Sequence, residues 1–282
     1  RVGFRLGSFN PNETLVIDPV LGREWATLLG GMDYDAGRGV AVDPAGNAFV
    51  TGGTQTAAFP GADGFSTAQP GGLDAYVAKF TAAGAPVWFT YLGGARDDFG
   101  TAIVVKAGNA YITGMTGASG QSITDFPVTS DAAQGVHGVA AILGGTDAFF
   151  TKLNPAGTQL LYSTFFGGSE SDEAHAIAIS SNGVVYIAGQ TSSADLPGVL
   201  GKYQAVLYGP LDAFVSRYDP ATSPSTSLTF GWASYLGRAG EEKAFGVATD
   251  PFDHAYVVGS TGSVNFPVTP GGYGPTAYQQ LD

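Results

Sequence analysis

The chain of 282 residues contains no cysteine. Disulfide bonds, thiolate zinc sites and thiol nucleophiles are therefore excluded. Lysine and arginine are also scarce, with 12 residues against 24 aspartates and glutamates, and the formal net charge is −12. Because contacts with phosphate groups need lysine and arginine, this balance argues against nucleic acid or an anionic membrane as a partner. The same acidic balance permits cation binding.

Long apolar runs are missing as well. No run approaches the roughly 20 residues that a membrane-spanning helix needs, so the sequence predicts no transmembrane segment. The first residue is Arg1 and no signal-peptide pattern follows it, which leads us to expect a processed or truncated piece of a longer precursor. The lack of cysteine fits an exported bacterial protein, although it does not define a compartment.

Glycine, in contrast, is abundant, with 43 residues and no triplet period. Hydrophobic residues make up 44% of the chain and charged residues only 13%. This combination favours a β-rich fold with many tight turns over a disordered chain. The length is sufficient to bury a sizeable core, as one large domain or two small ones.

One stretch of the sequence occurs four times. Each copy starts with an aromatic residue, continues through Gly-Gly (Gly-Arg in the fourth copy) and an acidic turn, and ends in Gly-x-Thr. The copies are Trp25–Thr54, Trp88–Thr116, Tyr162–Thr191 and Trp232–Thr261. Within each copy, two segments rich in apolar residues flank a turn of Gly, Asn or Pro, which predicts a β-hairpin.

A long loop with a Phe-Pro or Leu-Pro pair follows each copy. The first three loops lead to a further apolar segment that begins with Asp-Ala and an aromatic residue: Asp74–Phe80, Asp147–Leu153 and Asp212–Tyr218. Four strands in a repeat of about 63–74 residues, without a helical period, predict an all-β fold of four-stranded antiparallel propeller blades. A β-solenoid would need a much shorter repeat, and the segments between copies hold too little apolar sequence for separate domains.

Four segments resemble the SBBP repeats, the "seven-bladed β-propeller" repeats of exported bacterial and archaeal proteins. They are Gly46–Gly52, Thr90–Gly94, Asp125–Thr129 and Asp147–Gly157. The resemblance extends over about residues 15–282. It implies a propeller with an extracellular, cell-surface or periplasmic location. It supplies no agreed activity and no catalytic residues.

The predicted organisation has two parts. Residues 1–24 are expected to form an N-terminal lead-in hairpin that can supply a closing strand, and residues 25–282 the propeller repeats. The predicted blades lie near residues 15–54, 74–116, 147–191 and 212–261, with a trailing loop at 262–282. Two arrangements stay open: a closed four-bladed propeller, which we slightly favour, and an arc of a larger propeller.

Two repeated positions are interpreted as architectural. All three tryptophans of the chain occupy the first position of a copy, which favours core packing over a surface platform for sugar. A cationic residue follows five positions after the aspartate of each Asp-Ala segment. Repetition in every blade indicates a structural pair or a solvated face at this position, occupied by Lys79, Lys152 and Arg217.

The acidic turns are the strongest candidates for chemistry. Each places a carboxylate four residues after the second member of the Gly-Gly or Gly-Arg pair: Asp35, Asp98, Asp172 and Glu242. Carboxylates beside turn carbonyls suit Ca²⁺, so these four are candidate calcium ligands. In the alternative interpretation each acid accepts hydrogen bonds from the turn backbone or pairs with a neighbouring blade. The spacing matches neither an EF-hand nor a nonapeptide calcium repeat.

No catalytic residue is predicted. The three histidines, His137, His175 and His254, occupy unrelated positions of the repeat, which argues against a metal triad. Nucleophile-elbow, HExxH and phosphate-loop motifs are absent from the sequence. We therefore expect no cofactor, with Ca²⁺ as the exception just described.

The loop between Thr116 and Asp147 is longer than its counterparts. Its excess, around Ala132–Gly145, is rich in Ala and Gly and carries three apolar residues: Val139, Ile142 and Leu143. Long insertions on one blade often carry binding, which makes these three candidate partner-binding residues. A tolerated insertion without function is the alternative.

These observations favour a non-catalytic, exported β-propeller that serves as a protein-interaction or scaffold module, as a subunit of a cell-envelope assembly. The expected partners are other envelope or extracellular proteins, and polysaccharide is a further candidate. One alternative is a carbohydrate-active propeller enzyme whose carboxylates meet in a central funnel, which rests on fold analogy alone. The other is a calcium-stabilised adhesin.

Overall fold

The computed structural model describes residues 25–57, 63–117, 126–138, 145–199, 203–221 and 227–269. These residues form 14 β-strands and no helix. The predicted lead-in hairpin at residues 1–24 lies outside the described residues. In the part of the chain that the structure describes, no helix could cross a membrane.

The strands form successive antiparallel sheets, the first three of which have four strands each. The first blade contains β1 (Asp35–Val42), β2 (Ala48–Thr54), β3 (Asp74–Phe80) and β4 (Pro86–Leu92). The second contains β5 (Asp98–Lys106), β6 (Asn109–Gly117), β7 (Thr146–Leu153) and β8 (Leu160–Phe166). The third contains β9 (Asp172–Ile179), β10 (Val185–Thr191), β11 (Asp212–Pro220) and β12 (Leu228–Leu236). The described part of the fourth contains β13 (Glu242–Thr249) and β14 (Ala255–Thr261).

The predicted strands and their antiparallel pairing are confirmed, but the sheets are grouped differently from the predicted blades. The predicted blade near residues 74–116 joins β3 and β4 to β5 and β6, whereas the hydrogen bonds join β3 and β4 to β1 and β2. The same shift applies to the predicted blades near 147–191 and 212–261. A repeat period defines the length of a blade but not the strand with which the blade begins. The first strand is decided by which strands pair, and here the second and third strands of a blade pair across the long loop.

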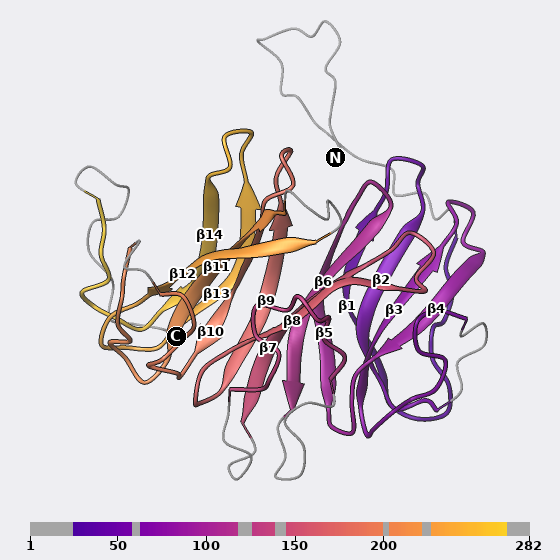
Figure 1. Ribbon diagram of the computed structural model, residues 1–282, viewed down its shortest axis with the longest axis horizontal. Coiled ribbons are helices and arrows are strands. Elements are labelled where there is room, and N and C mark those ends of the chain that lie inside the picture. Colours follow the sequence, from indigo (N-terminus) through magenta and orange to yellow (C-terminus); the bar gives the residue numbers. More distant parts are fainter. Residues whose placement is uncertain are drawn as a thin grey trace, which may run out of the picture.

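The blades lie side by side in the order of the sequence (Figure 1). The first strand of each blade (β1, β5, β9 and β13) is called its inner strand. From the second blade onward, the inner strand packs on the preceding blade: β5 contacts β1 to β3, β9 contacts β5 to β7, and β13 contacts β9 to β11. Apolar residues of both blades meet in each interface. Phe49, Ile103 and Phe149 belong to the core between the first two blades, and Ile177 and Phe214 to the next.

The described blades form an open arc and not the closed four-bladed ring that the sequence analysis slightly favoured. In β5, Ile103 faces the first blade and is 5% exposed, whereas its equivalent in β1, Val40, is 68% exposed. At the other end of the arc, Tyr256 in β14 is 60% exposed, although its equivalent Tyr111 is buried. Each end of the arc therefore presents apolar side chains that are covered elsewhere by a neighbouring blade.

The aromatic position of the repeat packs mainly in the core. Trp88 and Tyr162 are buried, and Trp232 packs partly buried against the core between the third and fourth blades. The indole N–H of Trp88 donates to the carbonyl of Pro155 at 3.2 Å, which ties the first blade to the second. Trp25 is 36% exposed and rests on Phe80. Core packing is thus confirmed at Trp88 and Tyr162.

The repeated cation is a structural partner of an aromatic ring in each complete blade. Third-strand cations lie directly opposite second-strand aromatics in the register of the sheet. The distances from cation to ring centroid are 5.0 Å for Lys79 and Phe49, 5.4 Å for Lys152 and Tyr111, and 5.8 Å for Arg217 and Tyr186. Burial lowers the pKa of Lys152. A cation over an aromatic face is attracted by the ring quadrupole, so the position has the architectural role that repetition predicted.

Candidate functional site

The four acidic residues of the predicted calcium set each begin an inner strand. The carboxylate of each accepts a hydrogen bond from a backbone N–H in the preceding turn. The donors and distances are Gly31 to Asp35 at 2.8 Å, Gly94 to Asp98 at 2.8 Å, Gly168 to Asp172 at 2.7 Å and Arg238 to Glu242 at 2.8 Å. Each acid thus closes its own turn, as the alternative interpretation predicted.

A second carboxylate joins this acid at each of the three junctions between described blades. The position where a Cβ would stand on Gly167 is 2.5 Å from an oxygen of Asp147 and 2.8 Å from one of Asp172. Corresponding pairs, Asp74 with Asp98 and Asp212 with Glu242, flank Gly93 and Gly237. Only glycine leaves room for two carboxylates at this point. Each junction therefore buries a carboxylate pair from the third strand of one blade and the inner strand of the next.

The pKa values of these groups show the cost of burial. Burial raises the pKa of Asp172 to about 6, against the lowering effect of hydrogen bonds from Thr191, Gly168 and Ser193. Burial also raises the pKa of Asp212. Because desolvation disfavours the charged form, Asp172 and Asp212 are costly to ionise.

The structure does not bring the four candidate calcium ligands together. Asp35, Asp98, Asp172 and Glu242 lie at four separate turns, each with its own backbone donor. Among the described residues, no group of three or more His, Cys, Asp or Glu side chains could hold a metal ion. Calcium binding therefore stays a prediction that needs a direct test.

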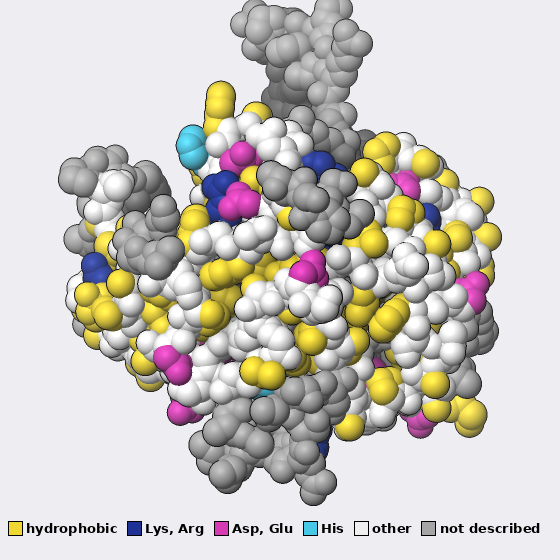
Figure 2. Space-filling model, in the orientation of Figure 1, with side chains coloured by type: hydrophobic (Ala, Val, Ile, Leu, Met, Phe, Trp, Pro, Cys, Tyr) yellow, Lys and Arg dark blue, Asp and Glu magenta, His cyan; other side chains and the backbone are white. Residues whose placement is uncertain are grey.

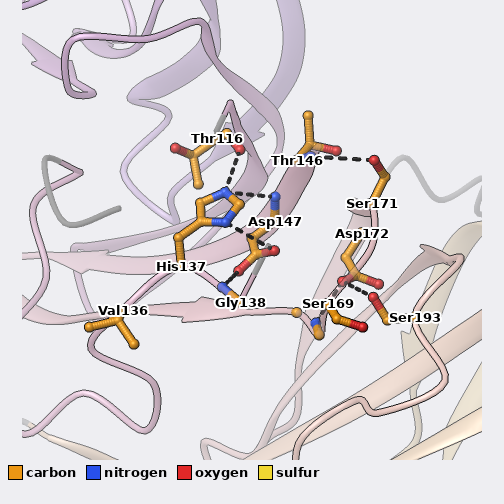
Figure 3. Close-up of polar contacts among 12 residues, drawn as sticks. Thr116, Val136, His137, Gly138, Thr146, Asp147, Ser169, Ser171, Asp172 and Ser193 are labelled. Carbon is orange, nitrogen blue, oxygen red and sulfur yellow. Dashed lines mark hydrogen bonds and ion pairs between the residues drawn. The ribbon is translucent and has the colours of Figure 1, made fainter. Parts of the chain in front are cut away.

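Figure 3 shows the junction between the second and third blades, where a histidine joins the carboxylate pair. The buried ring of His137 places Nδ1 3.4 Å from Oδ1 of Asp147. Its Nε2 lies 3.2 Å from the carbonyl oxygen of Thr116 and 3.1 Å from the backbone nitrogen of Asp147. The N–H of Gly138 donates to Oδ2 of Asp147 at 2.6 Å. His137 thus fixes the described end of the long loop to the strand that follows.

A repeated glutamine also anchors these loops, which the sequence analysis did not identify. Gln134 and Gln204 each donate from the side-chain amide to the aspartate that begins the third strand, Asp147 at 3.4 Å and Asp212 at 2.7 Å. Their amide oxygens accept the N–H of Gly167 at 3.1 Å and of Gly237 at 3.0 Å. The shared pattern Gln-x-Val, at Gln134–Val136 and Gln204–Val206, was the available signal. Val139, Ile142 and Leu143, the predicted partner-binding residues, lie outside the described residues.

The inner strands share a further structural feature that the sequence analysis did not identify. Each has a β-bulge at the same position, occupied by Arg38, Thr101, His175 and Phe245. Thr101 donates from its hydroxyl to the carbonyl of Ala174 at 2.6 Å, and Nδ1 of His175 lies 3.1 Å from the carbonyl oxygen of Ala244. The bulge residue therefore connects one inner strand to the next.

His175, the bulge residue of β9, is at the centre of a small polar cluster. Its Nε2 lies 3.3 Å from a carboxylate oxygen of Glu173, which also accepts a hydrogen bond from Gln190 at 3.1 Å. The hydrogen bond with His175 is the main cause of the lowered pKa of Glu173. Phe245 stacks on the His175 ring at 5.9 Å. His175 thus lies in an inner strand, whereas His137 lies at the described end of the long loop.

The end of the described arc at β13 and β14 presents exposed apolar side chains. Phe245, Tyr256 and Val258 are all more than half exposed. A pocket of about 180 Å³ lies beside them, between the third blade and β14. On the face of the molecule in Figure 2, charged side chains are few, and most of the surface is apolar or uncharged.

Stacked antiparallel sheets, joined by one recurring turn and linked through their inner strands, define a β-propeller repeat protein. The SBBP family model, described as a β-propeller repeat, matches residues 24–60, 87–120 and 161–197. Three segments of the chain therefore match this repeat model, and they fall on the first three of the four copies.

A stretch of 73 residues is 38% identical to a protein named regulatory protein FlaEY from Caulobacter vibrioides. This stretch is 26% of the present chain and 7% of FlaEY. The chain thus covers a small part of that relative. The SBBP repeats suggest a protein-interaction module.

Proposed function

We propose that this chain is a non-catalytic protein-interaction module that binds its partner at the open end of the arc formed by β13 and β14. The observation that carries the proposal is the exposure of Tyr256, at 60%, where the equivalent Tyr111 and Tyr186 are 6% and 2% exposed. Contiguous apolar side chains that stay uncovered mark interaction surfaces in soluble proteins. The surface has the same kind of apolar composition as the interfaces between the described blades.

Tyrosine at the centre of such a surface favours binding to a protein. Aromatic side chains bury large areas and are enriched among the residues that dominate binding energy at protein interfaces. The carboxylate pairs support the non-catalytic assignment, because Asp147, Asp172 and Asp212 are fully buried. A glycosidase uses two carboxylates that face each other across an open cleft, and these buried pairs do not have that arrangement. The described acidic turns therefore do not favour the carbohydrate-active alternative.

A pull-down with a matched control tests this proposal. The bait is the full chain, and the double variant Tyr256→Ser/Val258→Ser removes the apolar surface. Val40→Ser, at the opposite end of the arc, is the control. We expect a partner that is retained by the full chain and the control but lost from the double variant, and that then binds the purified chain in a 1:1 titration. Retention of the partner by the double variant would contradict the proposal.

We further propose that the module works outside the cytoplasm, in an assembly at the cell envelope. The support is the SBBP repeat itself and the absence of cysteine, which removes any dependence on redox state. Fractionation of the source cells with an antibody against the chain tests it. Detection in the extracellular, surface or periplasmic fraction supports the proposal, and detection in the cytosol alone contradicts it.

Calcium-stabilised adhesion is the second candidate function, favoured by the carboxylate pairs at successive blade junctions. If the ion binds only the folded protein, Ca²⁺ at 100 times its dissociation constant would stabilise the fold by about 2.7 kcal/mol. Thermal unfolding in EDTA and in millimolar Ca²⁺ provides the test. A higher Tm with Ca²⁺, lost in Asp172→Asn, supports calcium binding, and an unchanged Tm contradicts it.

A further inference from the structure

His175 lies at the junction between the third and fourth blades, and both of its ring nitrogens face an acceptor. Nδ1 is 3.1 Å from the carbonyl oxygen of Ala244 in β13, and Nε2 is 3.3 Å from a carboxylate oxygen of Glu173. A carbonyl oxygen and an ionised carboxylate accept hydrogen bonds but cannot donate them. The ring therefore makes both contacts only when both nitrogens carry a proton, as an imidazolium.

A neutral imidazole has one N–H group and one nitrogen lone pair. With the proton on Nδ1, the ring donates to Ala244, and the lone pair of Nε2 faces the carboxylate of Glu173. With the proton on Nε2, the ring donates to Glu173, and the contact with β13 is lost. In the neutral state, either tautomer of His175 thus loses one of the two hydrogen bonds.

His137 has a different arrangement, although it also lies beside a carboxylate. Its Nε2 is 3.1 Å from the backbone nitrogen of Asp147, which is a donor, and its Nδ1 is 3.4 Å from Oδ1 of the same residue. A neutral ring with its proton on Nδ1 satisfies both of these contacts. Of these two histidines, His175 is therefore the one whose contacts require a second proton.

The surroundings of His175 favour the charged ring. The Phe245 ring stacks on it with centroids 5.9 Å apart and an interplanar angle of 18°, and an aromatic face attracts a cation at this distance. The hydrogen bond with His175 is the main cause of the lowered pKa of Glu173, which favours the ionised carboxylate opposite the ring. The side chains of His175 and Glu173 are 21% and 32% exposed, so protons can reach the pair from solvent.

Other charged residues come from the strands that pack on β9, namely β5, β6, β7, β10 and β13. β6 and β10 contain none. Those of the other three strands are Asp98, Lys106, Asp147, Lys152, Glu242 and Lys243. The three acids belong to the carboxylate pairs at the blade junctions. Lys106 donates to the carbonyl of Ser181 at 2.6 Å, and Lys152 lies over Tyr111. Lys243 acts on the cluster itself, because its charge lowers the pKa of Glu173.

We infer that His175 is a proton-dependent link between the third and fourth blades, complete when its ring is protonated and broken on one side when the ring is neutral. Imidazole is the side chain that ordinarily changes charge between about pH 5 and 8. The link therefore stabilises the position of β13 in mildly acidic solution, and this stabilisation is lost as the pH rises through neutrality. The inference goes beyond the proposed binding surface and does not depend on it, because no partner takes part.

Hydrogen exchange of the full chain at about pH 6 and about pH 8 tests the link. After correction for the intrinsic effect of pH, we expect the amides of β13 to exchange about tenfold faster at the higher pH, since one hydrogen bond of a charged group is lost. His175→Phe keeps a ring against Phe245 without a titratable nitrogen, so its corrected exchange in β13 should be equally fast at both pH values. The titration of Asp172 is common to both chains and cancels in their comparison.

Equal corrected exchange of β13 at the two pH values in the unmodified chain would overturn the inference. So would a pH dependence that survives in His175→Phe. Circular dichroism of each variant at both pH values establishes that it folds.

Glu173→Gln separates a proton-dependent link from a merely structural contact. A glutamine amide can donate to Nε2, so a neutral ring with its proton on Nδ1 then makes both contacts. We expect slow exchange of β13 at both pH values in this variant, in contrast to the fast exchange of His175→Phe. Retention of the pH dependence in Glu173→Gln would overturn the inference.

His254→Phe is the matched control, because it removes a second histidine close to the same hairpin. His254 is 69% exposed, and its Nδ1 lies 2.8 Å from a carboxylate oxygen of Asp250. The pH dependence of exchange in β13 should survive in this variant, and its loss would assign the effect to His254 and overturn the inference. None of these outcomes decides the proposed function, which is tested by loss of the partner from the Tyr256→Ser/Val258→Ser variant.

Discussion

Asp172 accepts a hydrogen bond from the backbone N–H of Gly168 at 2.7 Å, in the junction between the second and third blades. The hydroxyl of Ser193 donates to the same carboxylate oxygen at 2.8 Å. Burial nevertheless raises the pKa of Asp172 to about 6. The junction therefore depends on a carboxylate that is well positioned but costly to ionise.

The first prediction concerns the pH dependence of stability. The folded pKa of Asp172 lies above its ordinary value of 3.8, so the folded state binds more protons than the unfolded state between these pKa values. The contribution of this group to stability therefore falls as the pH rises from about 4 to about 6. In Asp172→Asn, we expect the free energy of unfolding to fall by about 3 kcal/mol less over this pH range than in the unmodified chain.

Urea unfolding at several pH values between about 4 and 7 measures this effect. The exposed carboxylate of Asp63 supplies the control, because Asp63→Asn should leave the pH dependence unchanged. If the stability of Asp172→Asn falls with pH as much as that of the unmodified chain, the raised pKa of Asp172 is not the cause of the fall.

The second prediction concerns the space between paired carboxylates. A Cβ on Gly167 would stand 2.5 Å from an Asp147 oxygen and 2.8 Å from an Asp172 oxygen. We expect Gly167→Ala to lower the free energy of unfolding by about 1–3 kcal/mol, since the crowded groups must move apart. Gly135→Ala is the matched control, because no atom lies within 4 Å of its Cβ position. Equal effects of the two substitutions in chemical denaturation would contradict the steric explanation.

The third prediction compares two tryptophans at the same repeat position. Trp88 is buried, whereas Trp25 is 36% exposed. We expect Trp88→Ala to cost about 3–5 kcal/mol and Trp25→Ala clearly less. Circular dichroism during urea unfolding gives both values without depending on tryptophan fluorescence. Equal losses in the two variants would show that the repeat position, rather than burial, sets the cost.

The fourth prediction tests the link between neighbouring inner strands. His175 contacts the carbonyl of Ala244 and stacks on Phe245, so His175→Ala removes contacts between the third and fourth blades. We expect a loss of about 1–2 kcal/mol in the free energy of unfolding. His254→Ala, at an exposed position, should change stability by less than about 0.5 kcal/mol. Hydrogen exchange should become faster in β13 of His175→Ala, and unchanged exchange there would contradict the proposed link.

Much of the fold could be predicted from the sequence, because the repeats show it four times. Alternating apolar residues identified the strands, and the tryptophan position predicted the burial of Trp88. Repetition also predicted an architectural role for Lys152, which the structure places over Tyr111. In each case the property belongs to one strand or to a pair of adjacent strands, so local pattern was sufficient.

Other features could not be predicted in the same way. His137 belongs to the long loop and Asp147 begins the Asp-Ala segment that follows it, and their contact forms only when the described end of the loop packs on that strand. His175 resembled an isolated histidine because its equivalents, Thr101 and Phe245, have different chemistry. The bulge that aligns these residues is a property of strand pairing. A comparison of the copies at this one position would have identified the series.

The sequence by itself determined the repeat, its β-strands, its acidic character and the residue types at each repeated position. These follow from periodicity and composition, which are local properties of the chain. Only the tertiary structure decided which strands share a sheet, that the acids occur as buried pairs, and that the described arc is open beside β14. These features depend on contacts between blades, and chain regions far apart in sequence meet only when the sheets pack together.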